Sequence, residues 1–234
     1  MDKLAVVTGG TKGIGRAVTA MFASQGYAVA TCARSEEDLA QLKTELEAEG
    51  DSKIHTFAAD LSKRKDIDDF LDFVTMTGKR LEILVNNTGV FIPGEVQTED
   101  DGVLQQLLET NLMSAYHVTR GLLTQLKKND KGHIFNVCST ASLEAYPNGG
   151  SYSISKFALY GFSQVLRHEL RAEGIRVTAV IPGPTFTPSW DGVEIDEDRL
   201  MKAADIAQMI WATSQLSEAS VVEDIIMRPQ LGDL

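Results

Sequence analysis

A tyrosine and a lysine, Tyr152 and Lys156, stand one helical turn apart in a segment whose apolar residues follow helical spacing. Residues at this spacing are neighbours on one helix face, and Leu159 and Leu166 extend that face inward. A buried ammonium beside a phenol would favour the phenolate and lower the pKa of the phenol from about 10 toward neutral pH. The pair therefore predicts a general acid or base, and a surface pair without chemistry is the alternative.

Two further polar residues fall where they could serve this pair. Ser139 ends an apolar, strand-like run, and its hydroxyl could hold a carbonyl oxygen beside Tyr152 or simply cap the next turn. Asn111 interrupts the apolar stripe of a long helix, and a buried amide must find partners. We expect Asn111 either to bond a neighbouring helix or to hold a water near Lys156.

A glycine cluster follows the first apolar run. Gly9, Gly13 and Gly15 give the spacing G-x-x-x-G-x-G, and a helical segment begins at once. Glycine permits a tight turn and lets a pyrophosphate approach the backbone, and the helix N-terminus offers free N–H groups. An ordinary strand–helix turn is the alternative. The position after the first strand favours a dinucleotide site.

The charges near this cluster predict which dinucleotide binds. A site for a free ribose hydroxyl usually carries Asp or Glu about 20 residues beyond the glycines. Here Arg34 stands at the end of the second strand, the first acid follows only at Glu36, and Lys12 lies within the glycine loop. Arginine and lysine suit a 2′-phosphate, so NADP is predicted and NAD is less favoured, with solvated surface cations as the alternative.

The elements that must position these residues alternate between strands and helices. Seven apolar runs are typical of buried parallel strands: Leu4–Thr8, Ala28–Cys32, Ile54–Ala58, Ile83–Asn86, His133–Cys138, Arg176–Ile181 and Asp224–Met227. Helices are predicted from Ser35 to Gly50, from Ser62 to Gly78, over about 101–128 and over about 152–173, with Ser35 and Ser62 as caps.

This alternation predicts an α/β fold: a Rossmann-like doubly wound parallel sheet in a three-layer α/β/α arrangement, as a single domain over residues 1–234. Ligands of such sheets bind at the carboxyl edge, where Asp60, Leu61 and the Asn86–Gly89 segment also fall. Asp60 could accept from an adenine amino group, although each segment alone is more typical of turn chemistry. The irregular stretch at about 184–200 is predicted to be a substrate loop.

Composition excludes several classes of function. The 234 residues carry 22 Lys and Arg against 33 Asp and Glu, a net charge of -11, which disfavours nucleic acid and membrane surfaces as partners. No apolar run is long enough to span a bilayer and no signal-peptide pattern is present, so a cytoplasmic location is expected. Cys32, Cys138 and the scattered histidines lack metal-ligand spacing, and no metal is expected.

Taken together, these motifs resemble the short-chain dehydrogenase/reductase family along nearly the whole chain, in particular its NADP-preferring members, which include 3-oxoacyl-carrier-protein reductases and carbonyl reductases. The resemblance is carried by Thr8, Gly9, Gly13, Gly15, Asp60, Leu61, Asn86–Gly89, Asn111, Ser139, Tyr152, Lys156 and Pro182–Thr185. Two features depart from the family: Thr88 replaces the usual alanine, and the segment from Met227 onward lacks the diglycine ending of many members.

The resemblance implies a role for each catalytic residue. Tyr152 would be the general acid or base, and Lys156 would bind the nicotinamide ribose and lower the Tyr152 pKa. Ser139 would orient the carbonyl, and Asn111 would anchor a water that links Lys156 to solvent. The implied cofactor residues are Gly9, Thr11, Lys12, Gly13, Ile14, Gly15, Arg34, Asp60, Leu61, Asn87, Gly89, Tyr152, Lys156, Pro182, Gly183 and Thr185.

The expected function is therefore NADP(H)-dependent hydride transfer involving a ketone, an aldehyde or a secondary alcohol of low molecular weight. Two alternatives remain: reduction of 3-oxoacyl groups on a carrier protein, which the acidic surface disfavours because such carriers are acidic, and NADP sensing without turnover. A homo-oligomer is expected, with the altered ending leaving open a tetramer or a dimer through the two long helices.

Overall fold

The protein is described by a computed structural model that covers residues 2–128, 132–190, 192 and 196–233. Its described residues form one sheet of seven parallel strands in the order β3-β2-β1-β4-β5-β6-β7. The strands are β1 (Lys3–Thr8), β2 (Ala28–Ala33), β3 (Ile54–Ala58), β4 (Arg80–Asn86), β5 (His133–Val137), β6 (Arg176–Pro182) and β7 (Asp224–Met227). The order reverses between β1 and β4, which confirms the predicted doubly wound sheet.

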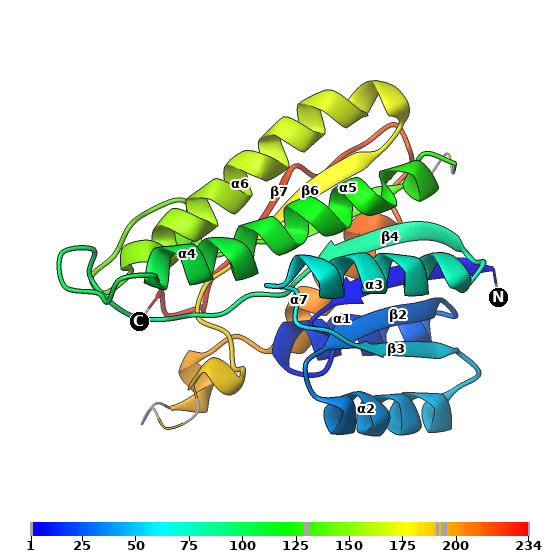
Figure 1. Ribbon diagram of the computed structural model, residues 1–234, viewed down its shortest axis with the longest axis horizontal. Helices are drawn as coiled ribbons and strands as arrows, with labels where there is room; N and C mark the ends of the chain where they lie inside the picture. The colour runs from blue at the N-terminus through cyan, green and yellow to red at the C-terminus, as the bar shows by residue number, and fades with distance from the viewer. Residues whose placement is uncertain (1, 129–131, 191, 193–195, 234) are drawn as a thin grey trace.

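Helices cover both faces of the sheet, giving three layers (Figure 1). One face packs against α3 (Arg64–Met76), α5 (Ser114–Leu126) and α6 (Gly150–Leu170). The other packs against α1 (Gly13–Ser24), α2 (Glu36–Glu49) and α7 (Ala203–Ser214). Short helical turns complete the chain: η2 (Thr140–Ser142), η3 (Arg171–Glu173), η4 (Pro188–Trp190) and η5 (Glu197–Arg199).

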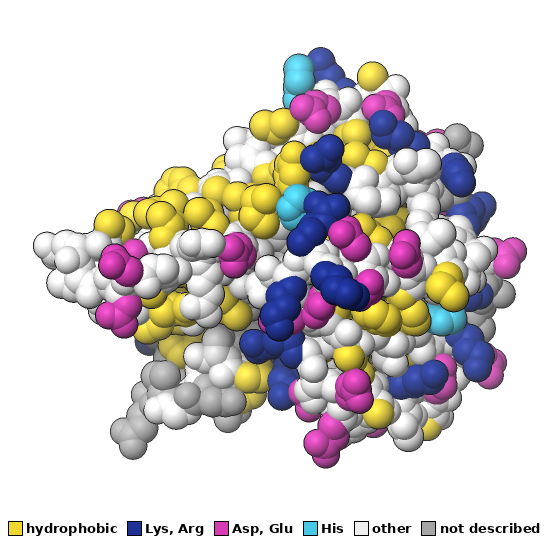
Figure 2. Space-filling view, in the orientation of Figure 1, with side chains coloured by type: hydrophobic (Ala, Val, Ile, Leu, Met, Phe, Trp, Pro, Cys, Tyr) yellow, Lys and Arg dark blue, Asp and Glu magenta, His cyan; other side chains and the backbone are white. Residues whose placement is uncertain are grey.

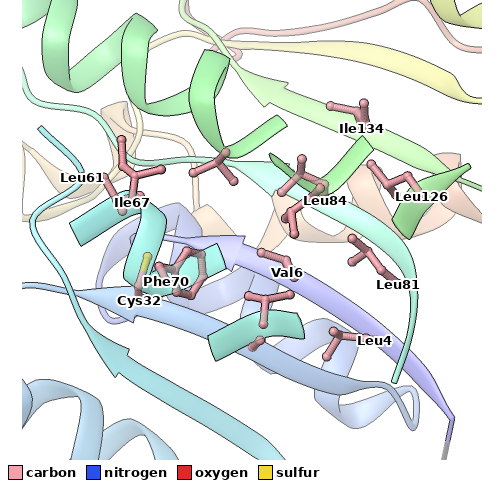
Figure 3. Close-up of a cluster of buried hydrophobic side chains, with 14 of the residues drawn as sticks. Leu4, Val6, Cys32, Leu61, Ile67, Phe70, Leu81, Leu84, Leu126 and Ile134 are labelled. Atoms are coloured by element: carbon pink, nitrogen blue, oxygen red, sulfur yellow. The ribbon is translucent and has the colours of Figure 1, made fainter. Parts of the chain in front are cut away.

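Alternating side chains of the strands build two cores. In β1, Leu4 and Val6 face the cluster that also contains Phe70 of α3, as Figure 3 shows. Ala5 and Val7 face the opposite cluster. Residues buried on both faces explain why the strands read as continuous apolar runs, and burial of each large side chain contributes about 1.5–3 kcal/mol to the stability of the fold.

The two predicted serine caps have different outcomes. Ser35 caps α2 as expected, because its side chain accepts a hydrogen bond from the backbone N–H of Asp38 at 3.1 Å. The prediction for Ser62 is wrong, since α3 begins at Arg64 and Lys63 takes the cap position. The Ser62 hydroxyl instead donates to the Asp60 carboxylate at 2.8 Å.

The helix predicted over about 101–128 is interrupted in the structure. It consists of α4 (Val103–Leu108), a π-helical turn η1 (Glu109–Met113) and α5. Asn111 lies in this π-turn and is fully buried. A π-turn adds a residue to one helical turn and is frequent at functional sites. No helix of the described residues is long and apolar enough to cross a membrane.

Candidate active site

The carboxyl edge of the sheet brings the predicted motifs to one cavity of about 660 Å³. Parallel strands end at the same edge, so the segments that follow β1, β4, β5 and β6 converge there. Nine predicted site residues line the cavity: Ile14, Asn87, Gly89, Ser139, Tyr152, Lys156, Pro182, Gly183 and Thr185. The others do not contribute to its wall: Gly9, Thr11, Lys12, Gly13, Gly15, Arg34, Asp60, Leu61 and Asn111.

Tyr152 and Lys156 share a helix face, as their spacing predicts, although α6 begins at Gly150 rather than at Tyr152. The Lys156 Nζ atom lies 5.8 Å from the centroid of the Tyr152 ring. Lys156 is only 5% exposed, and its ammonium donates to the backbone oxygen of Val137 at 3.0 Å. An ammonium has three protons, so this one bond leaves donors for a ligand in the cavity.

The ionisation of this pair differs from the sequence-based expectation. Burial raises the pKa of the Tyr152 phenol, Cys138 adds to the rise, and a hydrogen bond with Ser139 opposes it. Burial also lowers the pKa of Lys156. The predicted lowering of the Tyr152 pKa is therefore wrong for the cofactor-free protein, because one packed environment desolvates both groups.

Ser139 caps the next turn, which is one of the two alternatives that the sequence left open. Its side chain accepts from the N–H of Ala141 at 3.2 Å and caps η2, while its own N–H donates to Ser142 Oγ at 3.2 Å. The same residue lines the cavity together with Tyr152. The capping turn thus fixes the Ser139 hydroxyl beside the phenol.

Asn111 connects the π-turn to the site. Its side chain accepts from the N–H of Val90 at 2.8 Å and donates to the Val90 oxygen at 3.0 Å and to Ser155 Oγ at 2.9 Å. The bond to Ser155 of α6 is the contact with a neighbouring helix that the sequence offered as one alternative. A Cβ atom added to Gly89 would lie 3.3 Å from Asn111 Oδ1 and 3.5 Å from Lys156 Nζ. Gly89 therefore keeps open the space where these two side chains meet.

The glycine loop has the form of a cradle for a phosphate-bearing ligand. Gly9 and Gly13 have positive φ angles of 67° and 54°, a region that favours glycine. A Cβ atom on Gly15 would overlap the backbone oxygen of Gly9. The Asn87 side chain donates to the oxygens of Thr8 and Gly9 at 3.0 and 3.1 Å, which ties the loop to the end of β4. The glycines thus allow a tight turn into the N-terminus of α1, whose free N–H groups suit a phosphate.

The two predicted phosphate-reading cations have different surroundings. Lys12 forms an ion pair with Asp38 of α2 at 2.9 Å. Arg34 is exposed and makes no ion pair with any other described residue. Arg34 is therefore the cation that remains available to a 2′-phosphate, while Asp38 partly neutralises Lys12.

Asp60 and Leu61 act in the turn after β3. Asp60 accepts from the backbone N–H and the hydroxyl of Ser62 at 3.1 and 2.8 Å and lies 3.5 Å from the Lys63 ammonium. Leu61 is buried in the core. The structure thus shows the turn chemistry that the sequence offered as the alternative. Among the described residues, no group of histidine, cysteine or acidic side chains gathers where it could hold a metal ion.

The cavity also has a wall that the motifs did not predict, and another from the predicted substrate loop. Arg228 and Asp233, from the segment after β7, line it and form an ion pair with each other. Thr187 and Trp190 line it from the predicted substrate loop, and a Cβ atom on Gly13 would lie 2.9 Å from Thr187 Cγ2. Residues 191 and 193–195 of that loop lie outside the described residues. No periodicity marks the segment after β7, so only its return to the sheet edge identifies it.

Comparison with known proteins places these features in a family. A family model for short chain dehydrogenases matches residues 3–198. The chain belongs to the short-chain dehydrogenase family. This short-chain dehydrogenase is similar to the sepiapterin reductase of Chlorobaculum tepidum, at 31% identity over 100% of this chain and 99% of that protein.

Solved structures agree with the assignment. A metagenomic short-chain oxidoreductase in complex with NADP is 28% identical, with a TM-score of 0.85 over 98% of this chain and 97% of that one. A variant of the actinorhodin polyketide ketoreductase with NADPH is 26% identical, with a TM-score of 0.89 over 100% and 98% of the two chains. This short-chain dehydrogenase therefore has the Rossmann-like fold of an oxidoreductase family.

Proposed function

We propose that this protein is an NADP(H)-dependent oxidoreductase that interconverts a small ketone or aldehyde and the corresponding alcohol, with Tyr152 as the general acid or base. One observation carries the proposal. Tyr152, Ser139 and Lys156 line the same cavity, and Lys156 Nζ lies 5.8 Å from the centroid of the phenol ring that would carry the proton.

The residues present fit a nicotinamide dinucleotide. The glycine loop at the start of α1 supplies the cradle, and Gly89, Gly183 and Thr185 line the part of the cavity near Tyr152. Lys156 is buried with ammonium protons to spare, which suits two ribose hydroxyls. The bound nicotinamide would supply the hydride in reduction and accept it in oxidation.

The protein's own groups handle the proton and the charge. In reduction, negative charge develops on the carbonyl oxygen, and Tyr152 and Ser139 would both donate hydrogen bonds to it. The phenol proton then passes to that oxygen, and the Lys156 ammonium stabilises the phenolate that remains. In oxidation, the phenolate takes the proton from the alcohol. Phe91 packs its ring edge-on against Tyr152, with centroids 4.9 Å apart, and thereby fixes the plane of the phenol.

NADP is proposed over NAD because Arg34 stands unpaired, among the described residues, at the end of β2. Solved relatives bound to NADP or NADPH support this choice. The paired Lys12 contributes less, since Asp38 shares its charge. Segment 184–200 would act as the substrate loop of the single dinucleotide-binding domain.

The protein is also proposed to be a homo-oligomer, with a homodimer or a homotetramer as its form. Figure 2 shows hydrophobic side chains gathered where α4 and the first turns of α6 lie in Figure 1. Exposed apolar side chains on these two helices include Leu104, Ile154, Phe157 and Val165. A face of this kind on two long helices suits a second copy of the chain.

The test is a turnover assay followed by nicotinamide absorbance. The purified protein is incubated with NADPH or NADH and a panel of ketones, aldehydes and 3-oxoacyl thioesters, free and on a carrier protein. Faster oxidation of NADPH than of NADH with a small carbonyl would support the proposal. Activity confined to carrier-bound thioesters would favour a 3-oxoacyl-carrier-protein reductase, and tight NADPH binding without turnover of any member would favour a sensor.

A further inference from the structure

The segment after β7 turns back across the carboxyl end of β6. The N–H of Gly183 donates to the oxygen of Met227 at 2.8 Å, and Pro229 is buried behind it. A Cβ atom on Gly183 would lie 2.8 Å from the Asp233 carboxylate, so glycine lets the segment approach this closely. This path brings Arg228 and Asp233 to the wall of the cavity that holds Tyr152.

Among the described residues, four acidic or basic side chains line this cavity: Glu144, Lys156, Arg228 and Asp233. Lys156 is buried against Val137 and faces the proposed ribose position. Glu144 is exposed and belongs to the segment after η2. Arg228 is 43% exposed on its side chain and is bound to Asp233. Arg228 is thus the cation of this wall that a substrate could reach, on a protein whose net charge is -11.

We propose that Arg228 binds an anionic group of the substrate, a carboxylate or a phosphate, so that the substrates are oxo acids or phosphorylated carbonyls and the matching hydroxy compounds. This inference rests on the proposed function, whose substrate class it names. A guanidinium presents parallel N–H donors that match a carboxylate or phosphate in two bonds at once. Anchoring one end of the substrate at Arg228 would direct its carbonyl toward Ser139 and Tyr152.

When no substrate is bound, the Asp233 carboxylate pairs with Arg228 in place of the substrate anion. Its carboxylate has no hydrogen-bond partner other than Arg228 among the described residues. An ion pair this exposed contributes little stability, so a substrate anion can replace it at small cost. Gly232 has a φ angle of 86° and closes a turn onto the Pro229 oxygen at 2.9 Å, which places Asp233 opposite Arg228.

The experiment compares charged and neutral probes on three variants. The probes are 2-, 3- and 4-oxo acids with their methyl esters, and dihydroxyacetone phosphate with dihydroxyacetone. Arg228→Gln should raise KM for the anionic probes by about 10- to 100-fold, since a hydrogen bond to a charged group is lost, and should leave KM for the neutral probes within a factor of about 3. Asp233→Asn should lower KM for the anionic probes, because their competitor is gone.

Arg64→Gln is the matched control, since it also removes an exposed arginine from an ion pair, with Asp68 on α3, away from the cavity. It should change neither set of KM values. Thermal unfolding of each variant checks that folding is intact, and the shift in Tm caused by each probe with NADPH present measures binding without turnover. Comparison of the oxo acids with dihydroxyacetone phosphate shows whether Arg228 binds a carboxylate or a phosphate.

The outcomes separate the two proposals. Equal losses for charged and neutral probes with Arg228→Gln, or a wild-type protein that neither binds nor reduces any anionic probe, would overturn the role of Arg228. Arg228-dependent Tm shifts without turnover of any probe would support that role and overturn the proposed function. Turnover of neutral carbonyls alone would leave the proposed function intact and reject the anionic substrate class.

Discussion

The phenol of Tyr152 is the group on which the proposed chemistry depends, and its side chain is held by contacts on several sides. Phe91 packs edge-on against its ring, and Lys156 lies over its face. Both contacts are made with the ring and do not need the hydroxyl. Removal of the hydroxyl should therefore separate binding from chemistry.

Tyr152→Phe should reduce turnover by about 10²- to 10⁴-fold, because a positioned general acid is lost while the ring remains. NADPH should bind as it does to the wild type, which fluorescence titration can measure. Near-normal turnover in this variant would show that another group moves the proton.

The cofactor-free protein should hold Tyr152 in its neutral form at neutral pH. Burial disfavours the phenolate, so the Tyr152 pKa is raised above the ordinary value of about 10. The difference in tyrosinate absorbance between the wild type and Tyr152→Phe should therefore grow only above that pH. A midpoint near neutral pH without cofactor would mean that the Lys156 charge outweighs burial. Addition of NADP⁺ should move the midpoint down, because the positive nicotinamide favours the phenolate.

Arg34→Ala should weaken NADPH binding far more than NADH binding. The 2′-phosphate would lose a charge-assisted contact that NADH never makes, and such contacts contribute about 1.5–3 kcal/mol. Dissociation constants for both cofactors measure the difference. Arg16→Ala is the control, since Arg16 is another exposed arginine of this region and is paired with Glu45. Equal losses for both cofactors with Arg34→Ala would exclude a role in reading the phosphate.

At the scale of elements, the turn between β1 and α1 depends on the absence of side chains. Gly15→Ala should weaken binding of both cofactors and lower Tm, because its Cβ atom would overlap the Gly9 oxygen and the Asn87 side chain. Gly161→Ala is the matched control within α6, where an added Cβ atom meets nothing within 4 Å. It should leave cofactor binding unchanged. Normal NADPH affinity in Gly15→Ala would show that the loop does not bind the dinucleotide.

Most of the strands could be predicted because they carry nearly continuous apolar or β-branched runs, as is typical of strands covered on both faces. The start of β4 could not, since Arg80 and Glu82 look like loop residues. Glu82 is nonetheless buried, with Tyr27 donating to it at 2.9 Å and Arg80 at 2.5 Å. Tyr27 lies just before β2, so the local pattern of β4 does not contain this contact.

The same limit applies to the site. Tyr152 and Lys156 could be found because one helix carries both, at a spacing that local geometry fixes. The π-turn around Asn111 depends on bonds to Val90 and Ser155, and the capping role of Ser62 was lost to its bond with Asp60. Arg228 reaches the cavity only because β7 pairs with β6 and the chain then returns over Gly183. Contacts between residues far apart in the chain decide the first and the third of these, whereas the Ser62 bond to Asp60 is local.

At the scale of the whole molecule, the apolar side chains on α4 and α6 predict the oligomeric state. Phe157→Glu with Val165→Glu should convert the oligomer to a monomer, because two charges on each copy would be buried without partners. Light scattering after size exclusion measures the mass. Met76→Glu is the control, since Met76 is 85% exposed at the end of α3. An unchanged mass in the double variant would place the interface elsewhere.

The path of the chain after β7 places the residues proposed to bind the substrate on a different segment from those proposed to carry out the chemistry. The groups proposed to move the proton lie on α6 and beside η2, whereas Arg228 and Asp233 belong to a short stretch that follows the edge strand. Randomisation of residues 228–233 should therefore change substrate preference while the residues of α6 stay as they are. Libraries confined to that stretch would leave the residues proposed for hydride transfer unchanged. Replacement of the stretch by the corresponding segment of a relative should transfer that relative's substrate preference.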